Sequence, residues 1–454
     1  MILLIITILV IGSILIATEK YTNINKAAVA IFVGTLGWIL YVCFGADFVM
    51  GHHAVDYATF LDGAESSSAE VKQFIAYNVF LKYVGKASEI VLFLLATMVI
   101  VEILQNNGCF DFISQLLRTR SSQRMLWTLS VVTFLISANL DNLTTTVMML
   151  TIMHDVVIRQ RQRVLLGCAI VISANCGGAF TVIGDPSGIV LWNMGAVTAT
   201  NFSASMALPC LIAWLVPIFW IGRQLPTRIE TQWIVLPYRG DDTRLKVWQR
   251  LVMLFVGIGG LWFIPTFHSI TKLSPFLGAL CVLWIVNEIV NRKLMNADEM
   301  IQRRVPRVLQ YGVIQMMLFV LGIMLIVGFV KETGVAAQMA QAADRYMGNV
   351  LVLGFFTQML SSVLDSFMSL MTMVSMHDVA DGVQNVLYAQ NGAFWKMMAY
   401  ASAVGGNIFC IGSVTGLALM KMERIPLGWY AKNVGMVAFL AATAGLVAMY
   451  FIVA

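Results

Sequence analysis

The chain has 454 residues, of which 59% are hydrophobic and only 12% are charged. Soluble domains carry roughly 25% charged residues, so this composition excludes a water-soluble enzyme. The mean hydropathy of +0.82 extends over the whole chain, and about 20 apolar residues are enough to span a bilayer as a helix. The net charge of +5 is modest, and the seven cysteines form no Cys-x-x-Cys pair. The composition therefore predicts an all-α polytopic membrane protein without a disulfide framework or a zinc site.

Apolar runs follow one another along the chain, and the charged residues lie in the connections between them. If Lys20 and Lys26 face the cytoplasm, most basic residues fall on the cytoplasmic side, as membrane proteins prefer, and about ten of the runs cross the membrane. The runs are 1–17, 27–45, 89–105, 125–157, 164–195, 203–221, 250–268, 273–290, 313–330, 350–376, 393–420 and 432–454.

Two of the runs are interrupted by polar residues. Run 125–157 has a polar centre at 137–146, and each flanking arm of about 15 residues is only roughly 23 Å long, short of the ~30 Å hydrocarbon core. A re-entrant hairpin that enters from the cytoplasm, with Asp141 at its tip, also keeps Arg159 and Arg161 inside. Run 350–376 is interrupted around Asp365, and its acidic connection predicts a hairpin that enters from the outside.

The two interruptions belong to an internal repeat. Runs 164–195 and 393–420 also match each other, at a pair of glycines and at a later glycine followed by Asp or Ser. We predict that both runs are broken helices at these positions. Because the two hairpins enter from opposite sides, the sequence predicts an inverted repeat: a first half at 1–221, a cytoplasmic linker at 222–249 and a second half at 250–454. The matching positions are Ser137, Asp141, Asn142 and Thr145 with Ser361, Asp365, Ser366 and Ser369, and Gly177, Gly178, Gly184 and Asp185 with Gly405, Gly406, Gly412 and Ser413.

Asp141 is the sharpest candidate for an ion site, because a carboxylate inside a membrane is costly and usually marks an ion or proton pathway. Only oxygen-bearing polar side chains surround it in sequence, as hard cations prefer: Ser137, Asn139, Asn142, Thr144 and Thr145. Asp185 is a second candidate carboxylate, although it also suits the N-cap of a half-helix that starts at Pro186. Asp365 is equally compatible with a functional and a structural role. We expect Asp141, Asp185 and Asp365 to couple proton movement.

His52 and His53 raise the question of a pH sensor. We interpret them as a solvated loop pair.

The residues of the interruptions resemble the NhaD-type sodium/proton antiporters of the ion transporter superfamily. The matching segments are 137–146, 174–180, 183–185, 405–406 and 411–413. The resemblance implies proton-coupled export of Na⁺ or Li⁺ across a bacterial inner membrane, without a cofactor. It also implies that four residues of the first half bind the metal ion, namely Asp141, Asn142, Asn175 and Asp185. In the second half it implies ion-binding roles for Ser361 and Ser413. The chain departs from the family pattern at Ser366, where Asn is usual, and at Asn407, where Ser is usual.

Two alternatives stay open at this point. Another transporter of the superfamily would carry a carboxylate or an oxyanion, but such a substrate does not call for a central Asp141. An intramembrane aspartyl protease would use paired acids and carry a Gly-x-Gly-Asp motif. This chain has Gly184-Asp185, but Val182 stands where the motif has its first glycine. The expected partners are an alkali cation, protons and the lipid bilayer, with no nucleic acid, and a homodimer is one option for the assembly.

Overall fold

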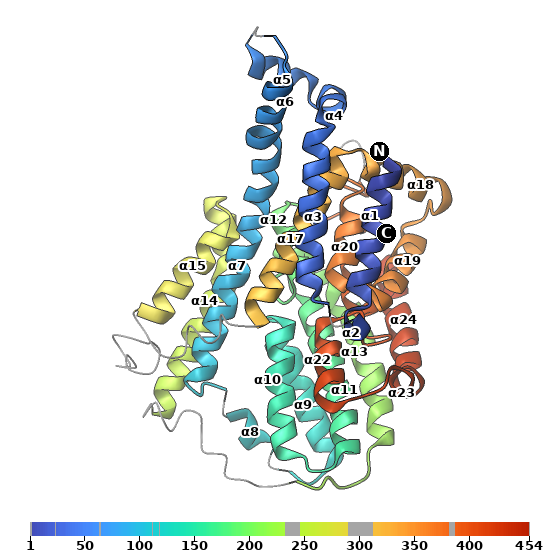
Figure 1. Ribbon diagram of the computed structural model, residues 1–454. Coiled ribbons are helices and arrows are strands. Elements are labelled where there is room, and N and C mark those ends of the chain that lie inside the picture. The colour runs from blue at the N-terminus through green and yellow to red at the C-terminus, as the bar shows by residue number, and fades with distance from the viewer. Residues whose placement is uncertain are drawn as a thin grey trace. The chain divides into compact units, whose positions relative to one another are not determined.

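The computed structural model describes residues 2–22, 24–62, 65–110, 112–117, 119–231, 246–288, 312–380 and 386–453. Within these ranges the chain is helical, and its only β interactions are isolated bridges (Figure 1). Seven helices in the described ranges are long and apolar enough to cross a membrane, so the predicted all-helical polytopic membrane protein is confirmed. They are Lys26–Cys43, Ser68–Gln105, Gln160–Phe180, Ala199–Gln224, Val247–Thr271, Ile314–Glu332 and Leu427–Val453.

The number of such helices is lower than the ten predicted spans. Two predicted spans form shorter helices, α1 (Ile2–Ala17) and α15 (Pro275–Trp284), and the run 393–420 divides into α21 (Ala393–Gly405) and α22 (Val414–Glu423). The helices α18 (Val335–Tyr346) and α19 (Val350–Val363) are each too short to cross a membrane. Taken together they are long and apolar enough, but the pair is bent by 120°. A hydropathy average over a run does not register such breaks and bends.

The described residues between the predicted runs 27–45 and 89–105 are largely helical. They form α4 (Gly45–His52), α5 (Ala54–Leu61) and the start of the helix Ser68–Gln105. That long helix begins at a capping box, in which the Ser67 hydroxyl accepts a hydrogen bond from the backbone N–H of Glu70 and the Glu70 carboxylate accepts one from the backbone N–H of Ser67. A capping box supplies partners for two N–H groups that have none inside the helix, so a polar sequence starts a helix here.

The chain divides into two compact units, each assembled from separate stretches. Unit 1 comprises Met1–Val91, Ile314–Asn349 and Met371–Asp378, and unit 2 comprises Leu92–Val313, Val350–Leu370 and Val379–Ala454. The predicted linker 222–249 includes residues 232–245, which lie outside the described ranges. Unit 1 contains α1, α2 (Glu19–Thr22), α3 (Lys26–Cys43), α4, α5, α6 (Ser68–Phe74), the π-helix η1 (Ile75–Phe80), the start of α7 (Leu81–Asn106), most of α17 (Gly312–Glu332) and α18.

In unit 1, α3 packs closely against α17 where both helices carry glycine. A methyl group on Gly322 would collide with the backbone at Ala30, and one on Gly34 would press on Leu325 and the carbonyl of Gly322. Small residues at such a crossing let the two backbones approach. The indole of Trp38 in α3 donates a hydrogen bond of 3.0 Å to the carbonyl of Leu325 in α17, which fixes the register of the pair.

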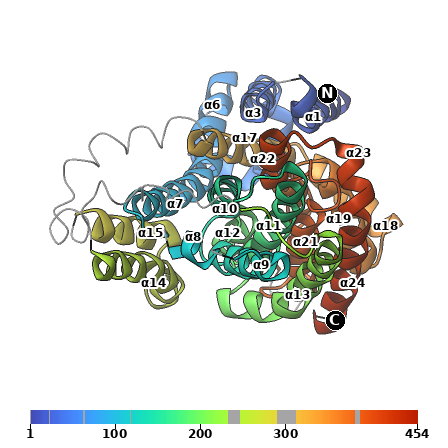
Figure 2. The ribbon, with the colours of Figure 1, turned by 90° about the horizontal axis from the view of Figure 1, so that it is seen from below.

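Unit 2 is built around α11 (Gln160–Phe180), which is almost completely buried. It packs against α9, α10, α13, α21 and α22, which surround it in the view from below (Figure 2). The other elements of the unit are α8 (Phe112–Leu116), α9 (Ser122–Ser137), α10 (Asn142–Val156), α12 (Pro186–Asn193), α13 (Ala199–Gln224), α14 (Val247–Thr271), α15, α19, the start of α20 (Ser366–Val374), α21, α22, α23 (Leu427–Tyr430), the π-helix η4 (Ala431–Gly435) and α24 (Met436–Val453).

The pair α9 and α10 forms a helical hairpin whose two ends meet one short segment. Ile229 donates its backbone N–H to the carbonyl of Arg120 at 3.0 Å, and Ile158 donates to the carbonyl of Glu230 at 3.1 Å. The residues before α9 and after α10 therefore lie beside residues 228–231, and the two arms run in opposite directions to a tip at 138–141.

Candidate functional site

Four helices of unit 2 begin at an interruption of an apolar run, and in each a side chain caps the first turn. Asp141 accepts a hydrogen bond from the N–H of Thr144 at 2.8 Å, and Asp185 from that of Ser187 at 3.0 Å. The same relation starts the other two helices, where Asp365 accepts from the N–H of Phe367 at 3.0 Å and Ser413 from that of Gly416 at 3.1 Å. The helices α10, α12, α20 and α22 thus each present an amino terminus, which favours negative charge, at a buried side chain.

Asp141 combines burial with an unsatisfied oxygen. Its Oδ2 accepts hydrogen bonds from the N–H and, at 3.0 Å, the hydroxyl of Thr144, whereas its Oδ1 is buried and has no hydrogen-bond partner in the described part of the chain. The hydroxyls of Thr145 and Ser187 are also buried without a partner there. A buried oxygen without a donor costs free energy, so Oδ1 is suited to receive a proton or a cation.

A hydrogen bond connects the tip of the α9–α10 hairpin to the break between α11 and α12. The amide nitrogen Nδ2 of Asn142 donates to Oδ1 of Asp185 at 2.7 Å. The hydroxyl of Ser137 donates to the carbonyl of Ala174 in α11 at 2.7 Å, which attaches the hairpin to α11. Because Asn142 directly follows Asp141, its bond to Asp185 brings two predicted acids into one polar cluster.

The side chain of Asn175 in α11 contacts residues at the break between α21 and α22. Its Nδ2 donates to Oδ1 of Asn407 at 2.7 Å and to the hydroxyl of Ser413 at 3.3 Å, and its Oδ1 accepts from the hydroxyl of Thr415 at 2.8 Å. Asn175 therefore joins α11 to the break between α21 and α22. Sequence reasoning missed Thr415, although the repeat contains the signal, because Thr415 follows Ser413 as Ser187 follows Asp185.

The second interruption repeats the contact of Ser137 with the carbonyl of Ala174. The hydroxyl of Ser361 donates to the carbonyl of Ser402 at 2.5 Å, as that of Ser137 does to Ala174, and the N–H of Ser366 donates to the carbonyl of Gly412 at 2.9 Å. Asp365 caps the start of α20 as Asp141 caps that of α10. Ser361 and Asp365 thus stand at the second break as Ser137 and Asp141 stand at the first.

Two glycines allow α11 to approach α9 and α21 to approach α19 closely. A methyl group on Gly177 would collide with the carbonyl of Phe134, and one on Gly405 would collide with the carbonyl of Gln358 at 2.6 Å. Here glycine is required by the close approach of two backbones, and it occupies matching positions of the repeat.

The donor set is sparse and contains only oxygen ligands for a cation. No group of three or more His, Cys, Asp and Glu that could hold a metal ion occurs among the residues that the structure describes. Carboxylate, hydroxyl and amide oxygens suit hard cations. Buried acids at interrupted helices, within a set of helices able to cross a membrane, define a membrane transporter of small ions or anions.

Comparison with known families agrees with this class. Residues 13–405 match the family model described as citrate transporter, CitMHS. The chain belongs to this family of membrane transporters, and it is not an enzyme. The alternative of an intramembrane protease is therefore wrong.

Several relatives carry names of cation antiporters. The chain is 31% identical over 368 residues to sodium/proton antiporter 1 of Arabidopsis thaliana, a match that covers 80% of this chain and 62% of the relative. It is 28% identical to sodium/proton antiporter 2 of the same plant, over 80% of this chain and 84% of the relative. It is also 26% identical to the Na(+)/H(+) antiporter NhaD of Vibrio cholerae, over 78% and 75% of the two chains. The resemblance to NhaD-type antiporters is thus confirmed.

Proposed function

We propose that the protein exchanges cytoplasmic Na⁺ or Li⁺ for external protons, and that cation and proton compete for the carboxylate of Asp141. The observation that carries this proposal is the buried Oδ1 of Asp141, which has no donor among the described residues. The names of the relatives support the same activity.

The competition follows from the cost of burying charge. An ionised carboxylate that is removed from water needs a compensating charge, and either a bound cation or a proton supplies it. Both cannot occupy the same oxygen atoms at once. A proton that arrives from outside therefore displaces the cation, and loss of that proton to the cytoplasm prepares the site for the next cation.

Neighbouring groups supply further ligands and further protons. Asn142 and Thr145 stand beside Asp141 on α10, and the hydrogen bond from Asn142 holds Asp185 at the same cluster. Ser137 contributes a further oxygen at the end of α9. If more than one proton moves for each cation, Asp185 and Asp365 are the acids that titrate with Asp141.

The second break supplies the other half of the site in this proposal. Asn175 and Ser413 are joined by a hydrogen bond, and Ser361 positions the second hairpin against α21. The matching contacts of the two breaks support an inverted repeat with two re-entrant hairpins, 125–157 from the cytoplasm and 350–376 from outside, and two broken helices, 164–195 and 393–420. A bacterial inner membrane is the expected location, and a homodimer the simplest assembly.

A carboxylate or oxyanion transporter is the second candidate, because the matching family model is described as a citrate transporter. An anion would favour hydroxyl, amide and cationic donors at the breaks. Three of the four capping side chains are instead acids, Asp141, Asp185 and Asp365. A citrate-uptake assay with the same protein preparation separates the two functions.

The test is exchange in liposomes that hold a pH-sensitive dye and are challenged with each alkali cation in turn. We expect Na⁺ or Li⁺ to drive proton movement in the wild type and Asp141→Asn to abolish it. Asp155→Asn is the matched control, since Asp155 is an exposed acid on the same helix. Exchange by Asp141→Asn at the wild-type rate would refute the assignment of the site, and citrate uptake without cation exchange would refute the function.

A further inference from the structure

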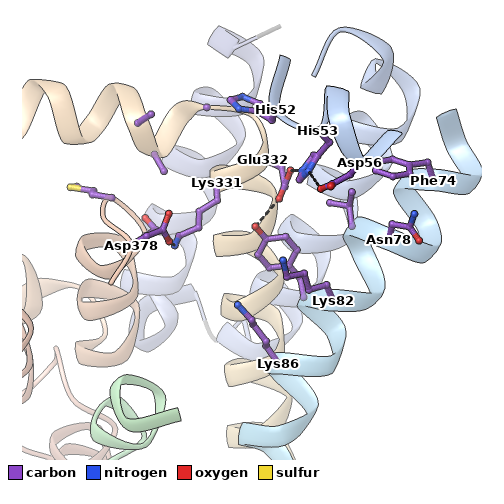
Figure 3. A pocket seen from close by; sticks show the side chains of 17 residues that line it. His52, His53, Asp56, Phe74, Asn78, Lys82, Lys86, Lys331, Glu332 and Asp378 are labelled. Carbon is purple, nitrogen blue, oxygen red and sulfur yellow. Dashed lines mark hydrogen bonds and ion pairs between the residues drawn. The ribbon is translucent and has the colours of Figure 1, made fainter. Parts of the chain in front are cut away.

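Glu332, the last residue of α17, contacts polar side chains from three other parts of unit 1. Figure 3 shows Glu332 and His53 close together. Its side chain is only 9% exposed. Its Oε1 accepts from the hydroxyl of Tyr83 in α7 at 2.8 Å, and its Oε2 accepts from that of Tyr41 in α3 at 3.3 Å. The same Oε2 lies 2.7 Å from Nε2 of His53. One buried carboxylate thus holds α3, α7 and the joint between α4 and α5 to the end of α17.

His53 lies between two acids. Its Nε2 faces Glu332, and its Nδ1 is 3.8 Å from Oδ2 of Asp56 in α5. The residue caps α4 by donating its backbone N–H to Val49, and its ring contacts Phe74 edge-on at 6.1 Å between centroids. Its side chain is only 25% exposed, so the interpretation of His53 as part of a solvated pair was wrong.

Protonation changes what His53 can do at this position. A neutral imidazole has one N–H, whereas the protonated ring has two and carries a positive charge. The protonated ring therefore faces both Glu332 and Asp56 with a donor, and its bond to Glu332 becomes charge-assisted, which is the stronger kind. Histidine is the side chain that ordinarily gains or loses its charge between about pH 5 and pH 8.

The neighbouring pair on α17 behaves differently. Lys331 donates to Asp378, in the segment after α20, at 2.7 Å. The surrounding protein removes some water from Asp378 and so disfavours its ionisation, but the hydrogen bond and charge of Lys331 outweigh this and hold the pKa of Asp378 below its ordinary value. The Asp378 carboxylate is therefore ionised at neutral pH.

A cavity of about 640 Å³ gives water access to this cluster (Figure 3). Both His53 and Glu332 line it, so protons reach the pair from solution. Besides the two tyrosines and Asp56, the charged or titratable groups that face the pair are His52 from α4, Lys82 and Lys86 from α7, Lys331 from α17 and Asp378.

We propose that His53 and Glu332 form a proton-operated clamp, which ties the α4–α5 joint to the end of α17 at acidic pH and releases it at alkaline pH. The ligand of this site is a proton, and none of its residues belongs to the transport site proposed in unit 2. Its direct consequence is that α4 and α5 open more readily as the pH rises.

Hydrogen exchange of the full-length protein in lipid nanodiscs tests the clamp without any transport measurement, because exchange of backbone amides reports local opening. After correction for intrinsic exchange rates, we expect amides of α4 and α5 to be about tenfold less protected at about pH 8 than at about pH 6, the effect of one hydrogen bond that loses its charge. We expect His53→Gln to remove this difference and His52→Gln, the neighbouring exposed histidine, to keep it.

His53→Lys gives a second, opposite test, because lysine keeps a positive charge and a donor at both pH values. We expect protection in His53→Lys to stay high at about pH 6 and about pH 8. Equal protection of the wild type at the two pH values, or a wild-type difference that persists in His53→Gln, would overturn the proposal.

A transport measurement then links the clamp to activity, and this step rests on the proposed cation/proton exchange. We expect His53→Gln to exchange faster than the wild type at about pH 6 and equally fast at about pH 8. Absence of exchange in the wild type would refute the proposed function alone, because the hydrogen-exchange experiment decides on the clamp independently.

Discussion

The amide of Asn142 donates a hydrogen bond of 2.7 Å to the carboxylate of Asp185 and so joins the first turn of α10 to the first turn of α12. Asp141, which immediately precedes Asn142, caps α10 with one oxygen and leaves the other without a partner among the described residues. The two acids are therefore held in one cluster by a neutral donor, which preserves the charge available to a cation.

Asn142→Ala should weaken cation binding more than it slows turnover. A hydrogen bond to a charged group contributes roughly 1.5–3 kcal/mol, so we expect the apparent KM for Na⁺ to rise about tenfold or more and the maximal rate to change less. Asn139→Ala is the matched control, because the Asn139 amide bonds to the carbonyl of Leu135 within its own hairpin arm and not to an acid. An equal rise of KM in both variants would contradict the role of Asn142.

The two glycines at the hairpin contacts should not tolerate alanine. We expect Gly177→Ala and Gly405→Ala each to destabilise the protein by about 1–3 kcal/mol, because the added methyl group meets a backbone carbonyl that cannot move away cheaply. Thermal unfolding of the purified protein measures the effect. Gly259→Ala is the control, since its methyl group has free space and alanine favours a helix by up to about 1 kcal/mol. Equal melting temperatures for all three variants would contradict the close approach.

The ion pair of Arg163 and Glu423 should matter for stability rather than for ion exchange. The Nε atom of Arg163 lies 3.0 Å from Oε1 and 3.1 Å from Oε2 of Glu423, whose side chain is 1% exposed. Removing one partner of a buried pair leaves an uncompensated charge and costs about 3–5 kcal/mol. We expect Arg163→Met to lower the melting temperature and the double variant with Glu423→Leu to recover most of the loss. A double variant as unstable as Arg163→Met would contradict this explanation.

The pair of Lys331 and Asp378 should be insensitive to pH near neutrality. Because the pKa of Asp378 is lower in the folded protein, its contribution to stability is present above the ordinary carboxyl pKa of about 3.9 and is lost as the pH falls through the lowered value. We expect Asp378→Asn to lower the melting temperature slightly and by the same amount at about pH 6 and about pH 8, since Asp378 is 90% exposed and such pairs contribute about 0–1 kcal/mol. An effect that appears at only one of the two pH values would contradict this account.

The interruptions of the helices could be predicted from the sequence, because polar residues such as Asp141 and Asp365 are costly inside apolar runs and therefore mark breaks. The capping role considered for Asp185 is also confirmed. The partners of Asn175 could not be predicted, since Thr415 is separated from it by 240 residues and only the packing of α11 against α22 brings them together.

The cluster at Glu332 could not be predicted for the same reason. Its partner Tyr41 is 291 residues away and lies in another helix, and no local pattern connects them. The interpretation of His52 and His53 as a loop pair fails for His52, which is the last residue of α4.

The most direct test of the central claim is proton release from the purified protein in detergent when Na⁺ or Li⁺ is added at constant pH. If cation and proton compete for Asp141, the wild type will release protons in proportion to the bound cation, and Asp141→Asn will release fewer or none while Asp155→Asn matches the wild type. Undiminished proton release from Asp141→Asn, or cation binding by the wild type without any release, would contradict the account.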